Sequence, residues 1–325
     1  MLESVCDVSM SPGGRERVET AEALLKEAGF TVSQVCCSRP SCFDFAARKS
    51  NDLIFIKVQS DMENLSPYDS MELQSISRSV SATSLLISEK ARERPLEDDT
   101  VYSRYYVSAV TLKTLESIMF GHAHPLIQAG PGGYHVEIDG AAIRRRRQEL
   151  GLSMGETAKM LGISRRTLYG YERGMAKASV SAAYNLIYTL GIPVAKPINV
   201  FEKLRRHRKC AILATAKRVL AKNTLLTRIF GKPRSCRVTT VKRAPFDFVI
   251  TVPEKKMRVI GGVAGNREFD LDKRVDEILS VSRVVQAHPL LITEGQTLPN
   301  RDIPFIQKEE LSRFKNTEDL IVSVL

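Results

Sequence analysis

Hydrophobic residues recur along this chain with two different spacings. In the central segment 143–174 they return every three or four positions, which predicts short amphipathic helices. Before and after that segment, short apolar runs such as LIFIKV (53–58) and LLITE (290–294) are bounded by polar residues, which predicts buried strands. The chain is therefore expected to combine a helical centre with α/β segments on either side.

The central segment, IRRRRQELGLSMGETAKMLGISRRTLYGYERG, carries the signals of two helices joined by a tight turn. Ser153 and Glu156 form a Ser-x-x-Glu capping box, which starts the first helix. Gly162 ends that helix where a positive φ is needed, and Ser164 caps the second helix. Apolar residues at helical spacing then pack the two helices against each other, as a helix-turn-helix requires.

This segment resembles the Cro/Xre-type helix-turn-helix family of phage repressors, from residue 143 to about residue 197. The resemblance implies a five-helix DNA-binding domain over 141–197, in which helix 164–173 lies in the major groove as the recognition helix. It implies DNA contacts from eight residues, which are Ser153, Ser164, Arg165, Arg166, Thr167, Tyr169, Gly170 and Arg173.

Two arginines in the first turn of that recognition helix are expected to contact bases or phosphates. A guanidinium donates two parallel hydrogen bonds to guanine, so Arg165 and Arg166 have the chemistry of base readers. Thr167 and Arg173 are expected to contact phosphates, which position a protein on DNA without reading its sequence.

The net charge of +11 is concentrated in the middle of the chain. The stretch 143–173 carries eight bases and three acids, and the stretch 202–234 carries eleven bases and one acid. A basic centre predicts binding to a polyanion, with nucleic acid as the first candidate. Phosphate contacts are expected from four residues of the second stretch: Arg205, Arg206, Arg208 and Lys209. The alternatives are that this basic stretch is simply solvated, or that it neutralises the acidic N-terminal segment.

A weak internal repeat flanks the helical segment. Phe43-Asp44-Phe45 matches Phe246-Asp247-Phe248, and LLISE (85–89) matches LLITE (290–294). Both copies are consistent with the order helix, strand, strand, helix, strand, strand, helix. Each copy is therefore predicted to be an α/β domain with a mixed sheet.

This order of elements resembles the restriction-endonuclease-like fold of nucleases and Holliday-junction resolvases. In that fold an Asp and a Glu-x-Lys pair lie on adjacent strands, where two carboxylates bind Mg²⁺ and the Lys helps to activate water. Here Asp44 and Lys57 occupy the expected places, but Phe55 replaces the Glu. One carboxylate makes a poor magnesium site, and a role for Asp44 as a hydrogen-bonding residue at the start of a strand is the simpler interpretation.

The second copy departs further from the nuclease pattern. Asp247 remains, while the Glu position is assigned to Val259 and the Lys position to Gly261. Neither copy is expected to be catalytic, so the protein is predicted not to be an enzyme. The alternative is a Mg²⁺-dependent nuclease that acts through Asp44 and Lys57 of the first copy.

The whole arrangement resembles a family of archaeal HTH-type transcriptional regulators, in which a domain bearing Phe-Asp-Phe precedes a Cro-type helix-turn-helix. The expected fold class is α/β plus all-α, with the helix-turn-helix domain between two restriction-endonuclease-like α/β domains that have mixed sheets. The expected boundaries are a tail 1–17, an α/β domain 18–120, a linker 121–140 ending in a short strand, a helix-turn-helix domain 141–197 and an α/β domain 198–325.

The remaining features narrow the class of protein. The chain shows neither an apolar run of about 18 residues, as a membrane span needs, nor an export signal. Its six cysteines form no Cys-x-x-Cys pair, which predicts reduced thiols in the cytoplasm and no structural zinc. No metal or cofactor is expected, since the histidines lack a ligand set.

The expected function is sequence-specific transcription regulation, with double-stranded DNA as the partner. A homodimer is expected because one reader module contacts only a few base pairs. The flanking domains would serve dimerisation or bind an effector or a partner such as the transcription machinery. A further alternative is a transcription coactivator or bridging factor, since Cro-type domains also occur in such proteins.

Overall fold

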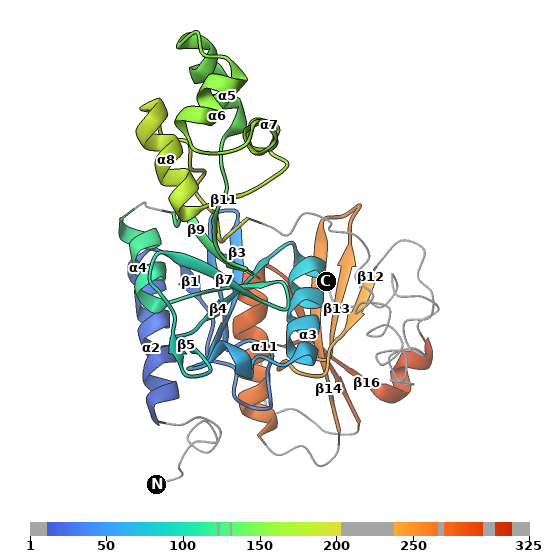
Figure 1. The fold of residues 1–325 in the computed structure, drawn as a ribbon. Coiled ribbons are helices and arrows are strands. Elements are labelled where there is room, and N and C mark those ends of the chain that lie inside the picture. The colour runs from blue at the N-terminus through green and yellow to red at the C-terminus, as the bar shows by residue number, and fades with distance from the viewer. Residues whose placement is uncertain are drawn as a thin grey trace. The chain divides into compact units, whose positions relative to one another are not determined.

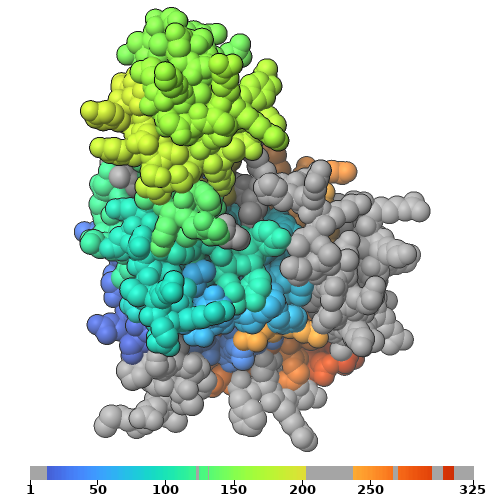
Figure 2. Space-filling view, in the orientation of Figure 1, coloured from blue at the N-terminus to red at the C-terminus, as the bar shows by residue number. Residues whose placement is uncertain are grey.

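The computed structural model describes residues 12–121, 124–130, 132–202, 237–265, 270–294 and 303–313. The other residues are drawn in grey in Figure 1 and in Figure 2. Contacts divide the chain into two compact units. The first, called the α/β unit below, comprises residues 1–88, 104–107 and 201–325, and the second, the helix-turn-helix unit, comprises 89–103 and 108–200. The domain boundaries predicted at residues 18, 121, 141 and 198 stay a prediction, because this division by contacts does not test which segments fold by themselves.

The first half of the α/β unit follows the predicted order of helices and strands. Strands β1 and β2 pair antiparallel, β2 and β3 pair antiparallel, and β3 and β4 pair parallel. The described elements are α2 (Pro12–Glu27), β1 (Thr31–Val32), β2 (Phe45–Lys49), β3 (Asp52–Val58), the short helix η1 (Met62–Asn64), α3 (Pro67–Val80) and β4 (Thr83–Ile87). Ser66 caps α3 through the amide of Asp69, and Ser81 ends it in the left-handed conformation.

The second half of the α/β unit repeats these pairings. β12–β13 and β13–β14 are antiparallel, β14–β15 is parallel, and β15–β16 is parallel as well. Its described elements are β12 (Arg237–Thr240), β13 (Phe248–Val252), β14 (Met257–Ala264), α11 (Leu271–Val285), β15 (His288–Thr293), β16 (Phe305–Gln307) and η2 (Lys308–Arg313). The mixed α/β class is confirmed, and the strand pairings of the two halves agree with the predicted repeat.

The two halves pack reciprocally within the unit. Helix α3 of the first half contacts β12 and β13, and helix α11 of the second half contacts β2 (Figure 1). Buried aromatic rings meet where the halves join, with the Phe43 and Phe246 ring centroids 6.1 Å apart. The halves therefore share a hydrophobic core, and neither buries its apolar face alone.

Strand register corrects the predicted counterparts of the nuclease residues. Phe45 pairs with Ile56 in the first half, and its equivalent Phe248 pairs with Gly261 in the second. The counterpart of Phe55 is therefore Ile260, and that of Lys57 is Gly262, so the assignment to Val259 and Gly261 is wrong by one residue. The cause is the turn between the strands, which is 253–256 in the second half but only 50–51 in the first.

The helix-turn-helix unit contains strands as well as helices. Its N-terminal elements are β5 (Lys90–Ala91), β6 (Arg94–Pro95), β7 (Thr100–Arg104), β8 (Val107–Val110) and α4 (Leu112–Phe120). Strands β9 (Ile127–Gly130) and β10 (Gly133–Val136) then form an antiparallel hairpin, where the sequence predicted a linker with one short strand. β10 also pairs with β11 (Ala178–Ser179), which ties the hairpin to the helices.

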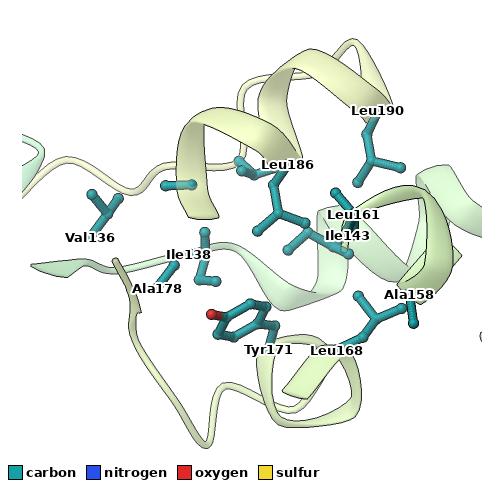
Figure 3. Close-up of a cluster of buried hydrophobic side chains, with 12 residues drawn as sticks. Val136, Ile138, Ile143, Ala158, Leu161, Leu168, Tyr171, Ala178, Leu186 and Leu190 are labelled. Atoms are coloured by element: carbon teal, nitrogen blue, oxygen red, sulfur yellow. The ribbon is translucent and has the colours of Figure 1, made fainter. Parts of the chain in front are cut away.

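Four described helices form the remainder of this unit: α5 (Gly140–Glu149), α6 (Met154–Met160), α7 (Arg165–Glu172) and α8 (Val180–Leu190). Their inward residues form one cluster with Val136, the last residue of β10, and Ile138, which follows that strand (Figure 3). Five helices were expected between residues 141 and 197, and the structure has these four. Gly191 ends α8 with a φ of 65°, and Pro193 and Pro197 follow, so the backbone does not continue as a helix.

Among the residues that the structure describes, no helix is long and apolar enough to span a bilayer.

Candidate nucleic-acid interface

Helix α6 begins with the predicted capping box. The Ser153 hydroxyl accepts a hydrogen bond from the Glu156 amide at 3.2 Å, and the Glu156 carboxylate accepts one from the Ser153 amide at 2.8 Å. These hydrogen bonds from Ser153 lower the pKa of the exposed Glu156 carboxyl, because they stabilise its charged form. The start of α6 is thus fixed by its own side chains.

The turn between α6 and α7 has the geometry that the sequence predicted. Gly162 has a φ of 66°, and the amide of Ile163 donates to the carbonyl of Ala158 at 3.0 Å. The Ser164 hydroxyl accepts a hydrogen bond from the Thr167 amide at 3.0 Å and lies 2.8 Å from the Thr167 hydroxyl. Ser164 therefore acts first as the cap that orients α7.

Helix α7 has one buried face and one exposed face. Leu168 and Tyr171 are buried in the cluster of Figure 3. Of the predicted DNA-contacting residues of α7, four are exposed: Arg165, Arg166, Tyr169 and Arg173. Thr167 and Gly170 are half-buried. Side chains available to a ligand are therefore mostly basic, with one aromatic ring among them.

The three exposed arginines of α7 differ in what holds them. A Cβ atom added to Gly155 would lie 2.8 Å from the Arg165 guanidinium, so the missing side chain of this α6 residue makes room for Arg165. The guanidinium of Arg173 lies 5.5 Å from the ring centroid of Tyr169. Arg166 makes no hydrogen bond or ion pair with another described residue, so its donors are open to a ligand.

An ion pair that the sequence did not reveal joins α7 to α5, with the Arg147 side chain 12% exposed and the Glu172 side chain 5% exposed. Arg147 and Glu172 form two parallel contacts, Nε to Oε1 at 2.6 Å and Nη2 to Oε2 at 3.0 Å. The remaining guanidinium nitrogen donates to the carbonyl of Leu152 at 3.1 Å. The hydrogen bond to Glu172 raises the pKa of Arg147, which keeps the guanidinium charged.

The neighbouring Arg146 also has an internal role, because its Nε donates to the carbonyl of Leu190 at the end of α8, at 2.9 Å. Of the four consecutive arginines at 144–147, only Arg144 and Arg145 are exposed. The charge count of the sequence therefore overestimated the number of arginines in this run that are available to contact DNA. No spacing rule connects residues 147 and 172, so the ion pair could not be predicted from the sequence.

Asp44 and Lys57, the two nuclease-like residues of the first half, bind each other. One Asp44 oxygen accepts from the Lys57 ammonium at 2.7 Å, and the other accepts from the Val58 amide at 2.6 Å. Phe55, at the position of the missing acid, is buried with its ring 4.8 Å from that of Phe43. No group of three His, Cys, Asp or Glu residues in the described part of the chain is placed to hold a metal ion.

Asp247 keeps the same backbone contact in the second half but changes its cationic partners. One oxygen accepts from the Val263 amide at 2.6 Å and from Arg274 at 2.5 Å, and the other accepts from Arg39 at 2.8 Å. Arg274 is a fully buried residue of α11, and its guanidinium lies beside Gly262, the counterpart of Lys57. A helix residue thus replaces the charge that the strand has lost.

The cysteines that the structure describes offer no reactive thiol to these sites. Cys36 and Cys42 are free and buried, and burial raises the pKa of both thiols well above the ordinary value, so they stay protonated. Cys37 is disulfide-bonded, so the expectation of six reduced thiols is wrong at that residue.

The basic stretch predicted to contact phosphates, which includes Arg205, Arg206, Arg208 and Lys209, lies outside the described residues. Its role stays a prediction.

Comparisons with known proteins agree with this division of the chain. A family model described as "PD-(D/E)XK superfamily domain" matches residues 15–125, and one described as "Helix-turn-helix" matches residues 143–196. No solved structure matches the chain.

Three relatives match nearly the whole length. The chain is 34% identical to a protein of Methanocella arvoryzae over 92% of each chain. It is 30% identical to a protein of Methanococcoides burtonii, over 91% of this chain and 92% of the relative. It is 29% identical to a protein of Archaeoglobus fulgidus, over 94% of this chain and 95% of the relative. All three carry the name "Putative HTH-type transcriptional regulatory protein".

Proposed function

Because the chain belongs to the family of archaeal HTH-type transcriptional regulatory proteins, we propose that it reads a specific duplex DNA sequence with α7 in the major groove. The observation that carries this proposal is the basic exposed face of a helix whose opposite face is buried and whose ends are capped. A rigid helix holds its side chains precisely enough to distinguish base edges. The protein would act in the cytoplasm, where an archaeal cell keeps its DNA.

Arg166 is the strongest candidate for base reading, since it has no internal partner among the described residues. Arg165 rests over the first turn of α6 and is suited to contact either a base or a phosphate. Arg173 and Thr167 are further along the helix and would contact phosphates. Ser153 and Ser164 are the exposed N-caps of α6 and α7, and the backbone amides at a helix N-terminus favour phosphate oxygens.

Selection of binding sites from random duplex DNA tests this proposal. Arg166→Ala and Arg165→Ala should each weaken binding to the preferred site by about 1–3 kcal/mol and weaken binding to random DNA less. Arg283→Ala, an exposed arginine on α11, is the matched control. Equal losses on both kinds of DNA would show that the two arginines contact phosphates. If no sequence is enriched, the reader proposal fails and a bridging factor is the better interpretation.

An exposed apolar face on α8 supports a homodimer. Val180, Tyr184, Ile187 and Tyr188 are exposed, and the two tyrosine rings stack with centroids 6.4 Å apart. Large apolar side chains at helical spacing on a surface favour a self-complementary contact about a two-fold axis. Helices α7 and α8 lie on different sides of α5, which contacts both, so a copy bound at α8 leaves α7 open (Figure 1).

Sedimentation equilibrium of the full chain tests the dimer. Tyr184→Glu with Tyr188→Glu should yield monomers, whereas Met175→Glu, a change at an exposed methionine outside α8, should not. A wild-type chain that is monomeric at all concentrations would contradict the proposal.

For the α/β unit we propose a role in binding an effector or a partner rather than in catalysis. The contacts of Asp44 and the apolar residues Phe55 and Ile260 at the acid positions support this role. A nuclease would need a second carboxylate beside Asp44 to bind Mg²⁺.

A further inference from the structure

A cavity of about 520 Å³ opens in the α/β unit beside the last turn of α3 and strands β12, β13 and β14. Four of its lining side chains are cationic: Arg78, Arg237, Lys256 and Arg258. Five others carry hydroxyl groups, and none of the described lining residues is a carboxylate. The volume is in the range of small-molecule sites, which span roughly 300–1,000 Å³.

The repeat explains why the cavity exists in one half. Arg48 of β2 reaches the last turn of α11, where its Nε donates to the carbonyl of Val284 at 2.5 Å. The equivalent residue in the second half is Thr251 of β13, whose hydroxyl donates to the carbonyl of Ser79 in the last turn of α3 at 3.0 Å. The short side chain of Thr251 thus makes the same contact as the long side chain of Arg48. The space that the Arg48 guanidinium fills in the first half therefore stays open in the second half.

The cations around this space have no acidic partner among the residues that the structure describes. Arg78 donates to the side-chain carbonyl of Gln74 at 2.9 Å, and none of the four cations forms an ion pair with a described residue. Arg258 and Arg48 both point at the carbonyl of Val285, and burial, together with the neighbouring charge of Arg258, lowers the pKa of Arg48. Like charges held this close favour an anion between or beside them.

The end of helix α3 does not offset this charge. The carbonyls of Ser77 and Arg78 accept hydrogen bonds from the amides of Ala82 and Ser81, at 2.7 and 3.5 Å. A helix C-terminus carries about half a negative charge, against four formal positive charges around the cavity.

We propose that this cavity binds a small molecule with two or more linked phosphate groups, of the class to which pyrophosphate and nucleoside triphosphates belong. Guanidinium forks, an ammonium group and hydroxyls are the side chains that bind phosphate oxygens best. A concave site of this volume encloses a free phosphate ester better than it fits the convex backbone of a duplex. The inference deepens the effector role proposed for the α/β unit and does not require that α7 reads DNA.

Isothermal titration calorimetry of the full chain with pyrophosphate and with ATP tests the site. The wild type should bind at one site per chain, and Arg78→Gln with Lys256→Gln should weaken binding about tenfold or more. Arg283→Gln with Lys255→Gln is the matched control: Arg283 is the counterpart of Arg78 on α11, and Lys255 is next to Lys256 but outside the cavity. The control should change affinity by less than about twofold.

Thr251→Arg separates the cavity from its charge. This change adds a positive charge but fills the cavity with a side chain as long as that of Arg48. It should therefore abolish binding of both ligands. If surface charge alone attracted phosphates, the same variant would bind them more tightly. Thermal unfolding of each variant checks that the fold is retained.

Three outcomes overturn the proposal: no saturable binding of either ligand, equal losses in the control, or tighter binding by Thr251→Arg. If the first outcome is accompanied by a loss of duplex affinity in Arg78→Gln with Lys256→Gln, these residues contact the DNA backbone instead. Arg166→Ala should leave pyrophosphate binding unchanged, so failure of the DNA-reading proposal is seen separately.

Discussion

Glu277 lies buried on α11, and one of its carboxylate oxygens accepts hydrogen bonds from the amides of Cys37 and Ser38, each at 2.8 Å. Glu72, its counterpart on α3, accepts hydrogen bonds from the amides of Lys242 and Arg243. Each glutamate therefore closes the loop that precedes the second strand of the other half. Removing either side chain would leave two backbone donors without their partner.

The pKa of the Glu277 carboxyl leads to a prediction about pH. Burial raises this pKa above its ordinary value of 4.5. The folded state therefore binds this proton more tightly than the unfolded state. The resulting contribution to the free energy of unfolding is fully present below the ordinary pKa and is lost as the pH rises through the raised pKa of the folded state. In Glu277→Gln the amide oxygen still accepts both amides without a charge. The free energy of unfolding of the variant should therefore rise relative to the wild type as the pH increases above the ordinary pKa of 4.5.

Urea unfolding of both chains at a series of pH values measures this difference. Glu254→Gln, an exposed glutamate on the turn between β13 and β14, serves as the control and should show no such trend. A difference for Glu277→Gln that stays constant or falls with pH would contradict the prediction.

At the scale of elements, α7 owes its position to packing and to the ion pair between Arg147 and Glu172. Arg147→Met should cost about 3–5 kcal/mol, because it leaves the Glu172 carboxylate buried without its cation. The double change Arg147→Met with Glu172→Leu should recover much of that loss, since both charges are then gone. Chemical unfolding measures both quantities, and DNA affinity should follow stability.

Arg144→Met is the matched control, because it changes an exposed arginine of the same helix. A cost below about 1 kcal/mol for Arg147→Met, or no recovery in the double variant, would show that the pair does not hold α7.

Local signals made the helix ends predictable, and distant contacts did not. Ser153, Ser164 and Gly162 each act on residues within four positions, so their roles can be read from the sequence. The partner of Arg147 is 25 residues away, and the hairpin of β9 and β10 depends on pairing with β11. The exact counterpart of Phe55 depended on a turn that is two residues longer in one half.

At the scale of the whole molecule, the repeat that the sequence showed as two flanking domains is one α/β unit with shared packing. A segment matching a PD-(D/E)XK model supplies the first half of that unit. The carboxylate that such enzymes use for a metal ion is here bound to Lys57 and to a backbone amide. Both Asp44 oxygens thus take part in hydrogen bonds within the α/β unit.

The full chain is expected not to cleave nucleic acid. Mg²⁺ needs several oxygen ligands, and Asp44 offers two oxygens that already accept hydrogen bonds, with Phe55 and not an acid beside it. Supercoiled plasmid, single-stranded DNA and branched junctions should remain intact with Mg²⁺ or Mn²⁺, even at protein concentrations that saturate DNA binding. Asp44→Ala is the matched variant. Cleavage that this change abolishes would show that a carboxylate elsewhere completes the site, and would make the protein a nuclease.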